Sequence, residues 1–146
     1  MISKKSVDQI DPAQLSEPHL DDEGWRNYAH GWQLFNERKF WHAHEAWEYV
    51  WKRDPSESRI FFQGIIQLPA AYHLLTVPLR YSGMMRNFDK AEEKLRLFPA
   101  IFLDVDVKGL LDAIAVARGE IARIGRDQLN MFSTGLIPVV PIPGRS

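Results

Sequence analysis

The chain has 146 residues, 45% hydrophobic and 25% charged, which is typical of one globular domain with a single core. Its formal net charge of −1 provides no basic surface, so we expect no nucleic-acid partner. The absence of cysteine excludes disulfides, thiolate zinc sites and cysteine nucleophiles, and it fits a cytoplasmic location. The apolar runs are interrupted too often for a membrane span, so we expect neither a signal peptide nor a membrane partner.

The N-terminal part of the chain predicts a flexible arm followed by a helical domain. Residues 1–19 are polar and contain two prolines, whereas residues 20–124 carry the helical patterns. The first helix begins at an aspartate cap, Asp21 or Asp22, and ends near Asn36. Its apolar residues recur every three or four positions, which places them on one face of the helix.

Three further helices follow in the middle of the chain. The second, from about 39 to 52, is apolar on nearly all sides and is therefore expected to be buried. The third, at 59–76, contains Pro69, which removes one backbone hydrogen bond and predicts a kink or a break. The fourth covers about 82–97. Its apolar residues form one stripe at helical spacing, and its charged residues form a solvated outer face.

The last part of the chain predicts a fifth helix and an extended tail. An apolar connector at 98–103 leads to the fifth helix, which Asp104 or Asp106 can cap. Residues 125–146 end in a proline-rich apolar tail, expected to lie along a groove of its own subunit or of a neighbour. The predicted fold is all-α, an antiparallel bundle or irregular array of about five helices.

Polar residues on the second and third helices define a candidate site. His44, Glu45 and Glu48 lie among aromatic residues, and Gln63 and Gln67 stand one turn apart on an otherwise apolar helix. A short connection makes the two helices antiparallel neighbours, so we expect these side chains to meet in a buried polar cluster. The chain is also rich in tryptophan, which builds an aromatic core or an aromatic-walled pocket: Trp25, Trp32, Trp41, Trp47 and Trp51.

The main hypothesis for this cluster is a structural network or a small-ligand or interaction site. In a structural network, the carboxylates, histidine and amides pair with each other and set the register of the helices. In a ligand or acid–base site, a histidine oriented by a carboxylate moves protons near neutral pH. The candidate ligand-binding residues are Trp41, Gln63, Gln67 and His73, and the candidate catalytic residues are His44, Glu45 and Glu48.

The alternative hypothesis is a metal-dependent hydrolase. His44-Glu45-x-x-Glu48 is similar to the zincin pattern His-Glu-x-x-His with its second histidine replaced by glutamate. His44 and Glu48 would bind a divalent metal together with His73 or His42, and Glu45 would be the general base. The sequence indicates no other cofactor, names no small-molecule ligand, and leaves both enzymatic activity and a homodimer open.

Three stretches form recognisable motifs: Leu34-Phe35-Asn36-x-x-x-Phe40-Trp41-x-Ala43-His44-Glu45-x-x-Glu48-x-x-Trp51, then Phe62-Gln63-Gly64-Ile65-Ile66-Gln67-Leu68, then Ala70-Ala71-Tyr72-His73. Together they resemble a family of small helical bacterial and archaeal proteins known as domain of unknown function 309, over about residues 30–115. The resemblance implies an all-α fold and no established activity, substrate or cofactor. The family's polar motif positions correspond here to His44, Glu45, Glu48, Gln63, Gln67 and His73.

Overall fold

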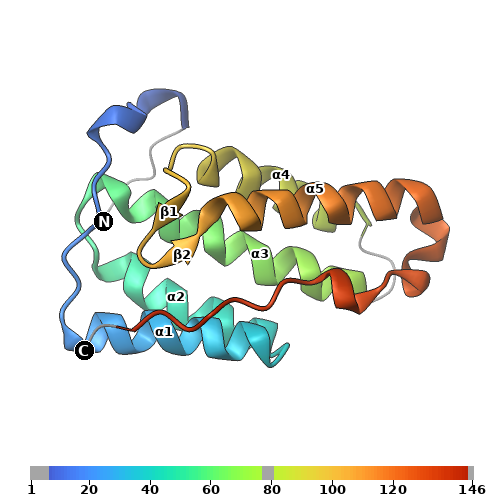
Figure 1. Cartoon of the computed structure of the whole chain (residues 1–146), viewed down its shortest axis with the longest axis horizontal. Helices are drawn as coiled ribbons and strands as arrows, with labels where there is room; N and C mark the ends of the chain where they lie inside the picture. The colour runs from blue at the N-terminus through green and yellow to red at the C-terminus, as the bar shows by residue number, and fades with distance from the viewer. Residues whose placement is uncertain (1–6, 77–80, 145–146) are drawn as a thin grey trace.

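The computed structural model describes residues 7–76 and 81–144, and within these ranges it contains five α-helices and one small hairpin (Figure 1). The all-α fold predicted from the sequence is therefore confirmed. The helices are α1 (Asp22–Asn36), α2 (Phe40–Arg53), α3 (Ile60–Thr76), α4 (Tyr81–Leu95) and α5 (Val107–Ile124). Asp21 caps α1 by accepting a hydrogen bond from the Gly24 N–H, and Asp106 caps α5 through the Gly109 N–H.

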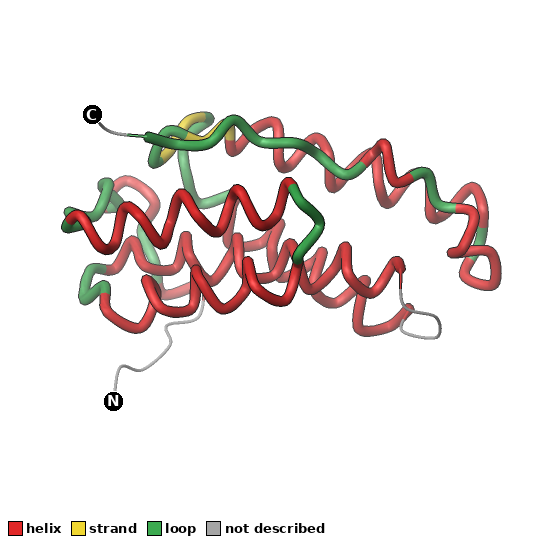
Figure 2. Tube along the Cα trace, turned by 90° about the horizontal axis from the view of Figure 1, so that it is seen from below, coloured by secondary structure: helices red, strands yellow, loops and turns green. Residues whose placement is uncertain are grey.

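The first four helices pack mainly against their neighbours in the chain, so α3 lies between α2 and α4 (Figure 2). Nearly every side of α3 is buried, in keeping with its apolar sequence. The helix runs unbroken through Pro69, and the break considered from the sequence does not occur. Helix α5 lies against α4, where Arg118 forms ion pairs with Asp89 and Glu92.

Aromatic side chains fill the interface between α1 and α2. Trp47 of α2 is fully buried, and its indole Nε1 donates a hydrogen bond to the Tyr28 carbonyl oxygen at 3.1 Å. The ring also lies against Trp32, with ring centroids 4.5 Å apart. The indole fits because residue 31 is glycine: a Cβ at Gly31 would lie 2.1 Å from Trp47 Nε1. The closest approach of the two helices thus depends on this glycine–tryptophan contact.

The segment predicted as an apolar connector contains a short hairpin of two strands, β1 (Ile101–Phe102) and β2 (Val105–Asp106). Its turn residues, Leu103 and Asp104, both have positive φ, at 47° and 60°. A two-residue turn of this kind favours Asn-Gly, so the sequence does not signal it. Tertiary hydrogen bonds hold it instead: Tyr28 Oη donates to the Leu103 carbonyl oxygen at 2.8 Å, and the Leu103 N–H donates to a Glu17 carboxylate oxygen at 2.7 Å.

The described parts of the N-terminal arm and of the C-terminal tail contain no α-helix. Short 3₁₀ turns occur at 7–9 and 12–14 in the N-terminal arm, and residues 1–6 of that predicted arm lie outside the described residues. After α5, two further 3₁₀ segments precede an extended run over 137–144, which follows α1 (Figure 1). The last two residues of the predicted tail, 145–146, also lie outside the described residues.

We predict that Gly31→Ala lowers the free energy of unfolding by about 1–3 kcal/mol, because the new methyl group overlaps the Trp47 indole. Chemical unfolding in urea measures this change. Gly119→Ala is the matched control, since no atom lies within 4 Å of a Cβ at that position in α5. For this control we expect the free energy of unfolding to rise by up to about 1 kcal/mol, because alanine has a higher helix propensity than glycine. Equal effects of the two substitutions would contradict the packing argument.

Candidate functional site

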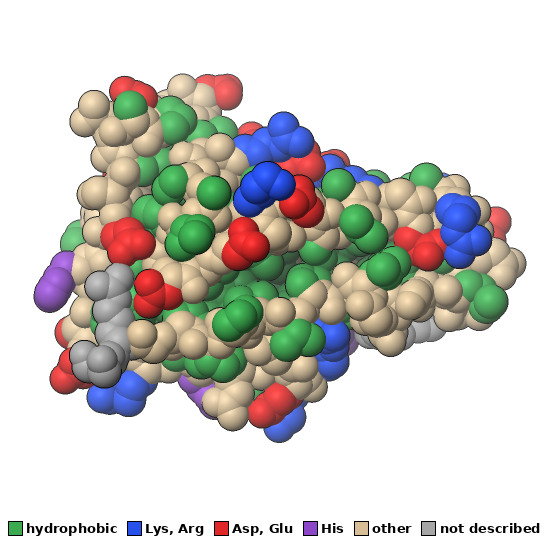
Figure 3. Space-filling view, in the orientation of Figure 1, with side chains coloured by type: hydrophobic (Ala, Val, Ile, Leu, Met, Phe, Trp, Pro, Cys, Tyr) green, Lys and Arg blue, Asp and Glu red, His purple; other side chains and the backbone are tan. Residues whose placement is uncertain are grey.

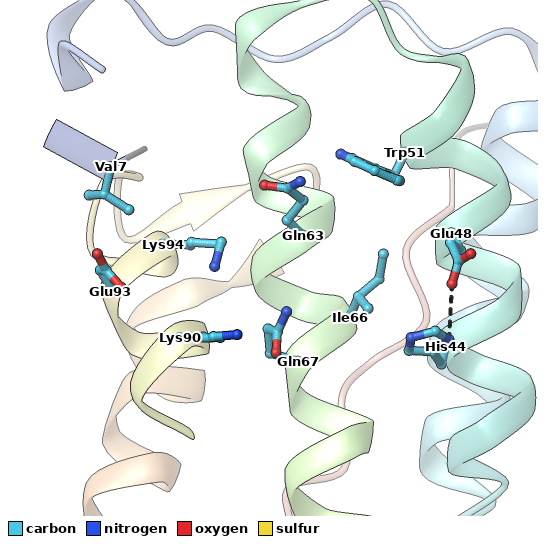
Figure 4. Close-up of a pocket in the computed structure, with 10 residues that line it drawn as sticks. All are labelled: Val7, His44, Glu48, Trp51, Gln63, Ile66, Gln67, Lys90, Glu93 and Lys94. Atoms are coloured by element: carbon cyan, nitrogen blue, oxygen red, sulfur yellow. Dashed lines mark ion pairs between the residues drawn. The ribbon is translucent and has the colours of Figure 1, made fainter. Parts of the chain in front are cut away.

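A pocket of about 490 Å³ lies over α3, between α2 and α4 (Figure 4). This volume is typical of small-molecule sites. Helix α3 forms the floor, and the other two helices provide the walls. The lining residues are Val7, His44, Glu48, Trp51, Gln63, Ile66, Gln67, Lys90, Glu93 and Lys94.

The floor of the pocket consists of two amides beside an apolar side chain. Gln63 and Gln67 are one turn apart on α3, with Ile66 next to them (Figure 4). Gln63 is only 8% exposed. Within the described residues, neither amide has a hydrogen-bond partner from the protein. Each amide can both donate and accept, so the floor offers unused hydrogen-bonding groups to the pocket.

The wall from α2 places a histidine between a carboxylate and an indole. His44 Nδ1 lies 3.3 Å from a Glu48 carboxylate oxygen, and the other oxygen of Glu48 lies 3.1 Å from Lys52 Nζ. The indole of Trp41 stacks on the imidazole of His44, with centroids 5.5 Å apart and an angle of 8° between the ring planes. The Glu48 carboxylate lies near Nδ1 without a hydrogen bond to it, and the indole covers one face of the ring at the edge of the pocket.

The wall from α4 contributes two lysines that the sequence analysis assigned to a solvated face. Lys90 and Lys94 extend from α4 toward the glutamines (Figure 4). Lys90 makes no ion pair with any described residue. Both lysines directly precede a residue of the buried stripe of α4, Ala91 and Leu95. This spacing was the sequence signal that could have placed the lysines at the edge of that stripe. Recognising it required knowing that this edge of α4 faces α3.

The structure brings together four of the candidate residues and leaves three aside. His44, Glu48, Gln63 and Gln67 line the pocket, but only Gln63 is buried, so the cluster is more open than expected. Glu45 is exposed on the outer side of α2 and pairs with His42 at 3.4 Å. Trp41 is 67% exposed and reaches the site only through His44. His73 is exposed farther along α3 and does not line the pocket.

Within residues 7–76 and 81–144, no third metal ligand accompanies His44 and Glu48. Among the residues that the structure describes, no group of three or more His, Asp or Glu side chains could hold a metal ion. His73, the expected third ligand, does not line the same pocket. The arrangement therefore shows a histidine–carboxylate pair and not a complete metal centre.

Two further hollows lie elsewhere in the described part of the chain. One, about 740 Å³, is formed by the arm and the start of α1, over residues 17–26. Another, about 410 Å³, lies between residues 19–24 and 49–55. None of the candidate residues lines either hollow, so residue chemistry favours the pocket over α3 despite its smaller volume.

Residues 28–86 match the family described as Domain of unknown function (DUF309), which confirms the resemblance noted in the sequence over this part of the chain. The matched region contains the pocket residues of α2 and α3, whereas Lys90, Glu93 and Lys94 follow it. No curated protein and no solved structure matches the chain. Within the ranges that the structure describes, every helix is too short or too polar to cross a membrane.

We predict that Glu48→Ala lowers the free energy of unfolding by less than about 1 kcal/mol. Partly exposed ion pairs on one helix contribute only about 0.3–0.5 kcal/mol each. Urea unfolding measures the change, with Glu45→Ala as the control, since it removes the exposed pair with His42 on the same helix. A loss above about 2 kcal/mol for Glu48→Ala alone would contradict this prediction and indicate a structural network.

Proposed function

We propose that the pocket over α3 binds a small polar molecule that carries an anionic group and an amide or hydroxyl group. The supporting observation is Gln63, whose side chain is buried at the pocket floor without a partner in the described protein. Its amide atoms still reach the open pocket, so water is their partner when no ligand is bound. A bound molecule can supply the partners that the fold does not.

The two glutamines suit a neutral hydrogen-bonding group of the ligand. Residues four apart on a helix are separated by about 6 Å along its axis, so Gln63 and Gln67 can contact neighbouring atoms of one molecule. Each amide offers an acceptor oxygen and two N–H donors. A planar amide, which also donates and accepts, complements this floor.

The charges at the walls favour an anion. Glu48 already lies near Lys52 and His44, so its negative charge is compensated within α2. Lys90 has no such compensation within the described residues. Glu93 extends away from the glutamines, toward Val7 (Figure 4). A carboxylate or phosphate beside Lys90 would therefore gain a charge-assisted hydrogen bond.

His44 serves this proposal as a binding group. The indole of Trp41 covers one face of its imidazole, which lowers the entropy lost when a ligand contacts the ring. The hydrolase alternative needs a third ligand beside His44 and Glu48, which the described residues do not supply. Binding of a small polar anion thus accounts for more of the pocket than metal-dependent hydrolysis does.

We predict that Gln63→Met leaves the free energy of unfolding unchanged or raises it, while ligand binding is lost. Methionine has a similar volume but no amide to leave unpaired, so the fold loses nothing that the protein itself satisfies. Urea unfolding tests the stability. Gln33→Met is the control, because Gln33 is an exposed glutamine that bonds Glu37 on α1, away from the pocket.

The binding half of this prediction can be tested by thermal shift with small carboxylates, their amides and sugar phosphates. A ligand present at 100 times its dissociation constant stabilises the protein by about 2.7 kcal/mol. Any shift should disappear in Gln63→Met, decrease in Lys90→Ala and persist in Gln33→Met. Destabilisation by Gln63→Met, with no shift for any compound in the unmodified protein, would support a structural role and overturn the proposal.

A further inference from the structure

The tail at 137–144 buries one side chain in every three. Ile137, Val140 and Pro143 are buried, whereas Val139 and Ile142 remain 68% and 48% exposed. A three-residue repeat is the period of the polyproline II helix, which Pro138, Pro141 and Pro143 also favour. The tail thus presents one apolar edge to the protein, on a face where apolar side chains gather between α1 and α5 (Figure 3).

Asn36, the last residue of α1, binds the tail through both ends of its side-chain amide. Its Nδ2 donates to the Val140 carbonyl oxygen at 2.7 Å, and its Oδ1 accepts from the Val140 N–H at 2.8 Å. This pairing satisfies both backbone groups of one residue in an extended segment, as a neighbouring strand would. Asn36 therefore recognises an extended backbone next to a buried apolar side chain.

Arg38 adds a second contact to the tail backbone. Its guanidinium donates to the carbonyl oxygens of Ile137 and Pro138, at 3.1 and 3.2 Å. Arg38 has φ 65°, in the position after the helix cap where glycine is usual. A residue other than glycine is strained in this conformation. The arginine gives these two hydrogen bonds in return, which glycine could not provide.

From these contacts we propose that the C-terminal end of α1 is a docking site for the tail of a second copy of this chain. Asn36 and Arg38 contact only backbone atoms of the tail, and the buried positions repeat every three residues. An identical tail from another copy brings the same contacts, which is the basis of segment exchange between protomers. Val139 and Ile142 leave further apolar surface for such a partner.

The chain's own tail competes with any second copy. A tethered segment acts at an effective concentration in the millimolar range, so an intact chain at lower concentration keeps its own tail in place. Docking between copies becomes visible when each chain is prevented from binding its own tail. Two variants separate the roles: Asn36→Leu disables the docking site, and Val140→Asp disables the tail.

The test mixes these two full-length variants. The tail of the Asn36→Leu chain is intact and meets the intact site of the Val140→Asp chain, whereas neither variant alone has both. We expect the equimolar mixture, but neither variant alone, to form a 1:1 complex of twice the mass of one chain in light scattering. No tether raises the local concentration of the tail in this mixture, so the measurement extends into the millimolar range in which the chain's own tail acts. A mixture that stays monomeric while both variants remain folded by circular dichroism overturns the proposal.

A second design leaves the docking residues unchanged, in case either variant fails to fold. A protease site introduced at the exposed Gly135 allows the tail to be cut from the otherwise complete chain. We expect a fluorescein-labelled peptide of residues 136–144 to replace the cut tail. This peptide binding should be lost when the chain also carries Asn36→Leu. Absence of peptide binding to the cut chain contradicts the proposal.

Discussion

The contact between Gly31 and Trp47 sets the geometry on which the pocket depends. With Ala43 and Trp47 buried, the rotation of α2 about its axis is fixed. Successive residues of a helix are turned by about 100°, so the neighbours of these two positions, His44 and Glu48, point to the side where α3 and α4 lie. The direction of the candidate site thus follows from a packing contact about 100° away around the same helix.

Helix α1 links this packing to the rest of the molecule. The Tyr28 carbonyl accepts the hydrogen bond from Trp47, and its hydroxyl donates to Leu103 in the hairpin turn. Burial raises the pKa of the Tyr28 hydroxyl far above its usual range, so the group acts as a neutral donor. At its end, α1 holds the tail through Asn36. One helix therefore connects α2, the hairpin and the C-terminal segment.

The two proposed sites rest on opposite kinds of observation. At the pocket, Gln63 and Gln67 have hydrogen-bonding capacity that the described protein does not use, which favours a ligand from outside. At the end of α1, Asn36 and Arg38 have partners, and those partners are backbone groups that any similar segment carries. No tail residue from 137 to 144 lines the pocket, so the two binding events can be studied separately.

The sequence by itself determined the helices and four pocket residues, because helical periodicity and a polar residue in an apolar helix are local patterns. For the caps of α1 and α5 it offered two aspartates each, and the structure selects Asp21 and Asp106. The sequence did not determine which polar residues share a pocket. The outward position of Glu45 depends on which face of α2 meets α1, and the contribution of Lys90 depends on how α4 packs against α3. Leu103 adopts a positive φ because Tyr28 and Glu17, distant in sequence, bind its backbone. Such features were decided by tertiary structure alone, since they arise from contacts between segments that carry no local signal of each other.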